Sequence, residues 1–322
     1  MIGFLKKFKV IFMCLLFILG LSVESCYAVT LPENFAQIQK EKDKKISDLK
    51  SLGVNFYNYN FNCPTDELKK RFDEMTEYRW KIYFKNPQDI HKPGAIGVFN
   101  EEYKPIENWD KLKSRFAYPT GLAYNVAHKN YNAGILIADA ENIFLAIEAP
   151  SSKNIDNFYE MISEYDVESL VRLNSFSEYD EDFYPYWEKY KLEESSEKLK
   201  IGDNIMDYYE YNWAHKQDAN VKDIAEIVEN VLSLRKGKIM AVSCRAGAGR
   251  TGTYICSYLI LNEIKKQIDR GVSIDDISLN IDKIVWEMSV QRPFAVTHFP
   301  QYEMLYRLAD YKLTKLKETT LE

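Results

Sequence analysis

The residues with the clearest chemical potential are a cysteine and an arginine six positions apart, Cys244 and Arg250. A short run, Lys238 to Ser243, precedes the cysteine and predicts a buried strand, and a helical pattern begins near the arginine. A loop between a strand and a helix can turn successive N–H groups inward, and the helix N-terminus adds about half a positive charge. The pattern therefore predicts a cradle for an anion the size of a phosphate.

The five residues between Cys244 and Arg250 form the wall of this predicted cradle. Gly247 and Gly249 permit the backbone angles and the close approach that a bound anion requires. Arg245 either adds positive charge for a polyanionic substrate or points into solvent. We expect the following loop residues to contact the substrate: Arg245, Ala246, Gly247, Ala248 and Gly249.

The chemistry expected of this loop is nucleophilic attack by sulfur. A free cysteine has a pKa of about 8.5, and a helix N-terminus or nearby cation lowers it to about 3.5–7.5, so Cys244 should be a thiolate at neutral pH. Arg250 presents a fork that can grip two phosphate oxygens and follow them into the transition state. Thr251 can donate a hydrogen bond to the sulfur and help it leave.

The surrounding pattern predicts strands with helices on their flanks, which is an α/β or α+β domain with a mixed sheet. The expected strands cover 133–138, 143–147, 169–173 and 238–243, with a turn at 139–142 joining the first two. The expected helices cover 64–84, 154–165, 221–232, 250–269, a segment from a Ser273 cap to about 290, and 299–315.

The N-terminal 28 residues have the pattern of a secretory signal peptide. A lysine-rich start is followed by an apolar run, Val10 to Leu21, and by small residues before a cleavage point after Ala28. The run is short for a membrane span, which needs about 20 residues. We expect a secreted or periplasmic protein with a leader and helical extension at 29–110 and a catalytic domain at 111–318, and we expect Lys42 to Lys45 to be solvated charge.

Composition excludes several other classes of function. The formal net charge of −6 shows no basic surplus, so nucleic acid is not an expected partner. After removal of the signal peptide three cysteines remain, Cys63, Cys244 and Cys256, too few for a disulfide framework. The histidines are scattered without ligand spacing, so neither a metal nor another cofactor is expected: His91, His128, His215 and His298.

The motifs over residues 112–312 resemble the tyrosine-specific branch of the protein tyrosine phosphatase family. The loop Cys244 to Thr251 is similar to the signature of the whole superfamily, and further segments resemble the tyrosine-specific motifs. These segments are Asn130–Ala133 ("Tyr-Ile-Asn-Ala"), Phe144–Pro150 ("Tyr-Ile-Ala-Thr-Gln-Gly-Pro"), Asn157–Met161 ("Asp-Phe-Trp-x-Met"), Val171–Leu173, Tyr186–Trp187, Gln291–Pro293 and Gln301–Tyr302.

The resemblance implies a twisted mixed sheet of the phosphatase type and a role for each matching position. Cys244 would be the nucleophile, Arg250 the phosphate clamp and Gln301 the residue that positions the attacking water. Thr297 stands at the family's second glutamine position. Two further roles are implied at positions before the loop: Phe116, after Arg115, would stack on the substrate ring, and Glu178 would brace the arginine.

The chain departs from the family pattern at two places beside the loop. Ser243 replaces the histidine before the nucleophile, although its hydroxyl can still hydrogen-bond the neighbouring backbone. The family's "Trp-Pro-Asp" general-acid loop reads Trp213 to Asp218 here, with Trp213 expected beside the substrate. His215 stands at the position of the family's general acid, and Asp218 is the alternative candidate. The third possibility is that neither residue serves as a general acid. The link from 188 to 212 is also short, which predicts that a hairpin is missing.

Three functions remain open from the sequence. The first is a phosphotyrosine phosphatase exported by a bacterium, without stable membrane insertion after signal cleavage. The second is a phosphatase of inositol phosphates or phosphoinositides, which Arg245 would suit. The third is a catalytically weak module that binds phosphate.

Overall fold

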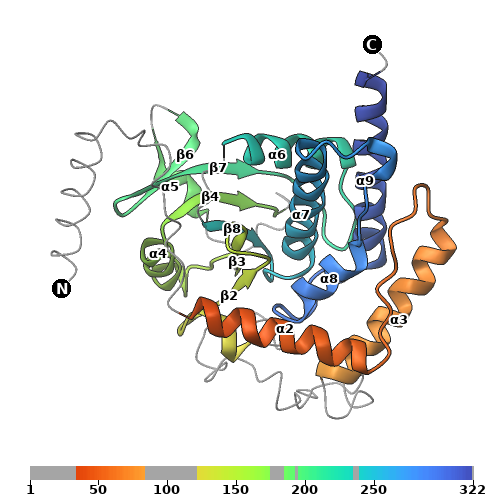
Figure 1. Cartoon of the computed structure of the whole chain (residues 1–322). Coiled ribbons are helices and arrows are strands. Elements are labelled where there is room, and N and C mark those ends of the chain that lie inside the picture. The colour runs from red at the N-terminus through yellow and green to blue at the C-terminus, as the bar shows by residue number, and fades with distance from the viewer. Residues whose placement is uncertain (1–33, 84–121, 175–184, 193–194, 235–238, 321–322) are drawn as a thin grey trace, which may run out of the picture. The chain divides into compact units, whose positions relative to one another are not determined.

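The strand that leads to Cys244 lies inside a mixed sheet. The computed structural model describes residues 34–83, 122–174, 185–192, 195–234 and 239–320, all within the compact unit Leu31–Glu322. Among these residues, eight strands form one sheet in the order β1-β2-β3-β8-β4-β7-β6-β5 (Figure 1). The strands are β1 (Val126–His128), β2 (Tyr131–Ile137), β3 (Ile143–Glu148), β4 (Val167–Arg172), β5 (Lys191–Leu192), β6 (Ser195–Ile201), β7 (Asn204–Glu210) and β8 (Ile239–Cys244).

Strand β8 is parallel to both of its neighbours, β3 and β4, and β4 is also parallel to β7. The remaining pairs, β1–β2, β2–β3, β6–β7 and β5–β6, are antiparallel. All six residues of β8 are buried, as expected of a central parallel strand that is covered on both faces. Ligands of open α/β sheets bind beyond the carboxyl ends of such strands. This topology therefore places Cys244, the last residue of β8, where a ligand site is expected.

Helices cover the sheet, and α7 contains the last residues of the loop Cys244 to Thr251, which is named the catalytic loop for its expected role. The helices are α2 (Phe35–Ser51), α3 (Thr65–Tyr83), α4 (Ile155–Glu164), α5 (Tyr186–Tyr190), α6 (Val221–Leu234), α7 (Gly249–Asp269), α8 (Ile281–Ser289) and α9 (Phe299–Thr320). Helix α7 packs against α6, α8 and α9, and α4 packs against β1, β2 and β6 (Figure 1). The predicted mixed sheet with flanking helices is confirmed.

Two local predictions are wrong. The segment after 188 does contain a hairpin, β6–β7, in which Ile201 pairs with Asn204 across Gly202 and Asp203. Gly202 has φ +61°, which suits the first central residue of a two-residue turn. The helix expected from Ser273 instead begins at Ile281, because Asn280 caps it by accepting a hydrogen bond from the Lys283 N–H at 2.8 Å.

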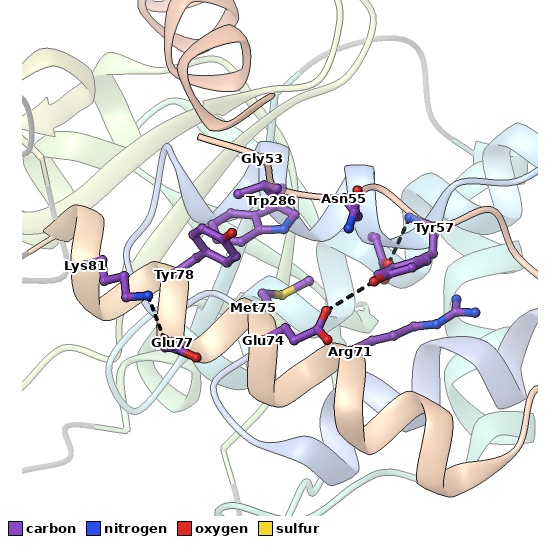
Figure 2. A pocket seen from close by; sticks show the side chains of 12 residues that line it. Gly53, Asn55, Tyr57, Arg71, Glu74, Met75, Glu77, Tyr78, Lys81 and Trp286 are labelled. Carbon is purple, nitrogen blue, oxygen red and sulfur yellow. Dashed lines mark hydrogen bonds and ion pairs between the residues drawn. The ribbon is translucent and has the colours of Figure 1, made fainter. Parts of the chain in front are cut away.

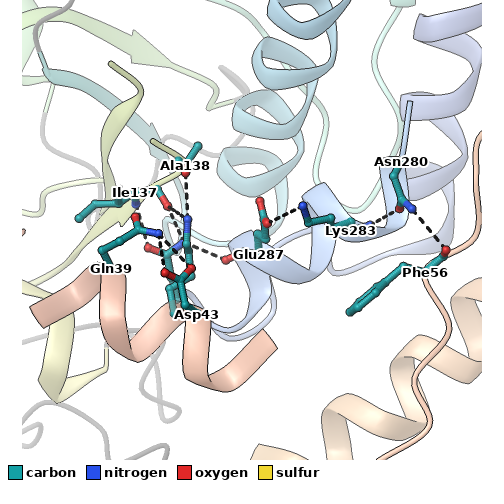
Figure 3. A network of polar contacts seen from close by, with 10 residues as sticks. Gln39, Asp43, Phe56, Ile137, Ala138, Asn280, Lys283 and Glu287 are labelled. Carbon is teal, nitrogen blue, oxygen red and sulfur yellow. Dashed lines mark hydrogen bonds and ion pairs between the residues drawn. The ribbon is translucent and has the colours of Figure 1, made fainter. Parts of the chain in front are cut away.

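The lysine-rich segment lies in helix α2, but part of it is not solvated. Lys42 on α2 is 3% exposed, and its Nζ donates to two carbonyls at 3.1 and 2.9 Å. These carbonyls belong to Ile137 and Ala138, which are labelled in Figure 3. Burial lowers the pKa of Lys42, against the opposing effect of Glu287. Lys45 is also buried, with its ammonium near the ring of Tyr124. The expectation of solvated charge is therefore wrong for both lysines, because this face of α2 docks on the end of β2.

None of the described helices combines the length and the apolar character that a bilayer span requires. The predicted signal peptide, residues 1–28, lies outside the described residues.

Candidate active site

The catalytic loop joins β8 to α7 and depends on glycine for its shape. Gly247 has φ +64°, and a Cβ atom there would lie 2.4 Å from the carbonyl carbon of Ile147. A Cβ atom on Gly249 would lie 2.8 Å from the Thr297 hydroxyl oxygen. Both contacts are shorter than real Cβ contacts, so the tight turn and the close packing of the loop require the two glycines.

Cys244 differs from the other two cysteines in the described residues. Its thiol is 2% exposed, and burial alone would raise its pKa; the Arg250 guanidinium, the hydroxyl and N–H of Thr251 and the Ala248 N–H together hold that pKa below its usual value. The Thr251 hydroxyl is buried and makes no hydrogen bond to any described residue, so it is available to the sulfur. Burial raises the pKa of both Cys63 and Cys256. Cys244 is therefore the thiol best suited to act as a nucleophile near neutral pH.

Arg250 lies in the first turn of α7 and is 3% exposed. Its Nη1 donates to the carbonyl oxygen of Trp213 at 2.6 Å. This hydrogen bond brings the expected general-acid loop, Trp213 to Asp218, to the arginine that is expected to grip phosphate. The two parts are far apart in sequence, and the fold brings them together.

Trp213 anchors the general-acid loop instead of facing a substrate. Its indole is 1% exposed and belongs to the hydrophobic core, while its Nε1 donates to the Gln217 carbonyl at 2.9 Å. The bond closes the loop on itself, with Lys216 in the left-handed region at φ 63°. We therefore correct the expectation that the Trp213 side chain contacts substrate: only its carbonyl, bound to Arg250, reaches the site.

The two candidate acids face different surroundings. The exposed His215 lies near His298, with ring centroids 6.5 Å apart. Burial lowers the pKa of His298, as do the charges of Lys216 and His215. Asp218 instead forms an ion pair with Arg307 on α9. His215 therefore lies beside His298, just before the start of α9 and Gln301, whereas Asp218 pairs with Arg307 further along the same helix.

This difference predicts which substitution affects protonation of the leaving group. We expect His215→Ala to lower kcat on an aryl phosphate with a poor leaving group by about 10²-fold or more, within the range for general acids. Asp218→Asn should change it little. Because only a protonated imidazole can donate the proton, the wild-type rate on that substrate should fall on the basic side of the pH profile.

A pH–rate profile of both variants checks this assignment. An aryl phosphate with a good leaving group serves as the internal control, because its departure needs little help from an acid. A loss of rate in Asp218→Asn alone would assign the acid to Asp218, and unchanged rates in both variants would leave the loop without an acid.

Gln301 and Thr297 lie beside the start of α7. Gln301 is 1% exposed, and its Oε1 accepts from the N–H groups of Thr297 and His298 at 3.1 and 3.3 Å. The same oxygen would lie 3.2 Å from a Cβ atom on Gly249. The structure thus brings Gln301 and Thr297 to the edge of the catalytic loop, as a role in positioning water requires.

Arg292 is a residue of the site whose role sequence reasoning did not assign. It is fully buried, and its Nε and Nη2 donate to the carbonyls of Gly247 and Ala246 at 2.8 and 3.1 Å. Burial lowers the pKa of Arg292 to about 10, against the raising effect of Glu148 and Cys244. Each peptide unit carries its C=O and N–H on opposite sides. Because Arg292 binds the carbonyls of Ala246 and Gly247, the N–H groups of the same two peptide units can point away from Arg292. The Gln291–Pro293 motif was the signal available in the sequence.

Other predicted positions have mixed outcomes. Ser243 is buried, and its Oγ has no hydrogen-bond partner among the described residues, so the expected bond to the neighbouring backbone is absent there. Arg245 is half-buried and is not simply directed into solvent. Phe116 and Glu178 lie outside the described residues. No cluster of metal-binding side chains occurs within the described ranges.

A separate pocket of about 330 Å³ lies along α3 and α8 (Figure 2). Its wall includes Tyr57, whose hydroxyl donates to Glu74 at 3.2 Å, and Tyr78 and Trp286. None of the predicted site residues lines it. The pocket is therefore distinct from the catalytic loop.

Comparison with known proteins decides the family. The model of the protein-tyrosine phosphatase family matches residues 122–206 and 192–311, which together span more than half of the 322 residues. The chain belongs to the protein-tyrosine phosphatase family. The sheet, the catalytic loop and the Gln301 segment of this phosphatase-family chain all lie within the matched range, whereas α2 and α3 lie before it.

Relatives and solved structures agree with this assignment. The chain is 25% identical over 240 residues to tyrosine-protein phosphatase 2 of Schizosaccharomyces pombe, covering 65% of this chain and 33% of that protein. It is 26% identical over 243 residues to tyrosine-protein phosphatase 69D of Drosophila melanogaster, covering 64% of this chain and 16% of that protein. The match thus spans a third or less of these two relatives.

A crystal structure of a protein tyrosine phosphatase from Trypanosoma brucei has the same fold. It aligns with a TM-score of 0.56 at 18% sequence identity, covering 77% of this chain and 93% of the other. A Trypanosoma cruzi protein tyrosine phosphatase aligns with a TM-score of 0.55 at 17% identity, covering 78% and 91%.

Proposed function

We propose that this chain is a cysteine-dependent protein-tyrosine phosphatase that works through a phosphocysteine intermediate. The observation that carries the proposal is the state of Cys244: a buried thiol whose pKa is held down by Arg250 and by N–H groups of the loop, while that of the other described cysteines is raised. Membership of the protein-tyrosine phosphatase family supports the same reaction.

The first step transfers the phosphoryl group to sulfur. The Cys244 thiolate attacks phosphorus, the P–O bond to the aryl group breaks, and the leaving oxygen takes a proton from His215. Arg250 and the N–H groups of the loop bind the equatorial oxygens, where charge is held in the transition state. For Arg250 to do so, its fork must share its donors between phosphate and the Trp213 carbonyl, so substrate binding is coupled to the position of the general-acid loop.

The second step regenerates the thiolate. A water molecule attacks phosphorus, the P–S bond breaks with its electron pair passing to sulfur, and the water proton passes to the now neutral His215. The Thr251 hydroxyl stabilises the departing sulfur. Gln301, beside Gly249, positions the water.

The test compares substrates on the purified protein without residues 1–28. A phosphotyrosine peptide should be hydrolysed with a higher kcat/KM than inositol hexakisphosphate or a phosphoserine peptide. Acid quenching during turnover should trap phosphate on the peptide that contains Cys244, as read by mass spectrometry. A preference for inositol hexakisphosphate would overturn the protein substrate, and binding of phosphate without turnover would leave a binding module.

We also propose that the protein is exported by a bacterium and acts as a secreted or periplasmic enzyme. The support is the charged start, the apolar run and the small residues before position 29. Cell fractionation with N-terminal sequencing of the exported form should find a chain that starts at Val29. A cytoplasmic protein with an intact N-terminus would contradict this.

A further inference from the structure

The C-terminal end of α3 holds the segment Phe294–Val296, which directly precedes Thr297. Arg79 is 4% exposed; its Nη1 donates to the Val296 carbonyl and its Nη2 to the Ala295 carbonyl, both at 2.9 Å. On the same end of α3, the rings of Trp80 and Tyr83 pack on Phe294, with centroids 5.6 and 5.8 Å away. Helix α3 lies before the range that the family model matches.

The segment that Arg79 holds has an unusual backbone. Phe294 and Val296 are both in the left-handed region, with φ 66° and 55°. A β-branched residue such as Val296 rarely adopts this conformation, which persists only when its surroundings hold it. Arg79 supplies that hold, because it satisfies two carbonyls of the segment that are buried away from water.

The same segment leads directly to the catalytic loop. The Thr297 hydroxyl donates to the Phe294 carbonyl at 2.6 Å, and the Thr297 N–H donates to Gln301 Oε1. Both side chains lie against Gly249, and Ala295 lies against Gly252 so closely that a Cβ atom there would be 2.7 Å away. A change in the turn at 294–296 would therefore move Thr297 and Gln301 relative to the loop.

We propose that Arg79 is a positioning residue for the second half of the reaction: it holds the turn at Phe294–Val296 so that Gln301 is placed for water attack on the phosphocysteine. The proposal rests on the proposed phosphatase activity. Arg79 touches no reacting atom and moves no proton. In the step that it serves, water attacks phosphorus, the P–S bond breaks and Cys244 leaves as the thiolate.

The consequence is a specific kinetic signature for Arg79→Met. The first step uses Cys244, Arg250 and the general-acid loop. Among the described residues, the hydrogen bonds of Arg79 go instead to Val296, Ser289 and Ala295. We expect kcat to fall by about 10²-fold, as for other misplaced catalytic groups, while kcat/KM stays near the wild-type value because KM falls in parallel. Stopped-flow measurement should show a burst of about one equivalent of aryl alcohol, with trapped phosphate on Cys244.

Two further variants separate this role from a structural one. Arg79→Lys keeps a donor for the two carbonyls and should recover much of kcat. Arg71→Met is the matched control: Arg71 lies on the same helix (Figure 2), is 6% exposed, pairs with Glu67 and has its guanidinium over the Tyr57 ring. Arg71→Met should keep the wild-type kcat and the wild-type burst. Equal losses of kcat and kcat/KM in Arg79→Met, or a comparable fall of kcat in Arg71→Met, would overturn the proposal.

Amide hydrogen exchange gives a readout that does not need turnover. In Arg79→Met, the amides of Thr297 and His298 should exchange at least about tenfold faster than in wild type, and in Arg71→Met they should not. If Arg79→Met does not fold, Arg79→Gln takes its place. A wild-type protein without turnover would overturn the proposed function, and the exchange rates would then decide alone whether Arg79 holds the turn.

Discussion

Replacing Cys244 with serine should abolish turnover of aryl phosphates and leave phosphate binding intact. The hydroxyl has almost the volume of the thiol, so the loop should keep its shape, but it is not ionised near neutral pH and is a far weaker nucleophile. We expect kcat to fall by at least about 10⁴-fold, the scale on which catalytic nucleophiles contribute. Steady-state assays measure the loss, and calorimetry with inorganic phosphate measures the binding.

The matched control is Cys63→Ser, because Cys63 is half-buried and lies outside the catalytic loop. It should keep wild-type activity. Residual turnover in Cys244→Ser within tenfold of wild type would mean that sulfur is not the nucleophile. Loss of phosphate binding together with turnover would show that the serine disturbs the cradle itself.

Arg250→Met is expected to have the next largest effect, through two separate causes. It removes the fork that binds phosphate in the transition state, which should lower kcat/KM by about 10³-fold on the scale of lost charge stabilisation. It also removes the cation beside Cys244. Because burial pushes the pKa of that thiol up and Arg250 pushes it down, the pKa of Cys244 should rise in the variant.

The pH dependence of thiol alkylation separates the two causes. In wild type, alkylation of Cys244 should continue below the pH at which an ordinary thiol becomes protonated, and in Arg250→Met its midpoint should move to higher pH. Arg250→Lys restores the charge without the fork, so it should recover the low midpoint and little of the rate. An unchanged midpoint in Arg250→Met would show that the loop amides and Thr251 alone hold the thiolate.

The sequence by itself was sufficient to predict the catalytic loop and most of the strands and helices around it. Strand, loop and helix around Cys244 follow from local patterns: an apolar run, two glycines and a helical repeat. The two glycines were readable as turn residues, although the contacts with Ile147 and Thr297 that require them are visible only in the fold. The hairpin β2–β3 and helix α6 were likewise predicted, because their periodicity is local and regular.

The sequence was less informative where charge and contact are decided by distant residues. Lys42 and Arg79 look like ordinary surface charges in helical segments, yet both are buried and donate to carbonyls about 95 and 217 positions away. The strands of the β6–β7 hairpin contain many charged residues, so their pairing was not predicted from an apolar pattern. Gly202 was the local sequence signal for the turn between them.

Tertiary structure alone decided how the site is held together. The bonds from Arg292 to the loop carbonyls, from Arg250 to Trp213 and from Arg79 to the turn before Thr297 all join segments that are remote in sequence. A buried cation must find acceptors wherever the folded chain provides them, and no local pattern records where those acceptors lie. The residue types of the catalytic loop were therefore readable from the sequence, whereas the residues that position it became visible only in the fold.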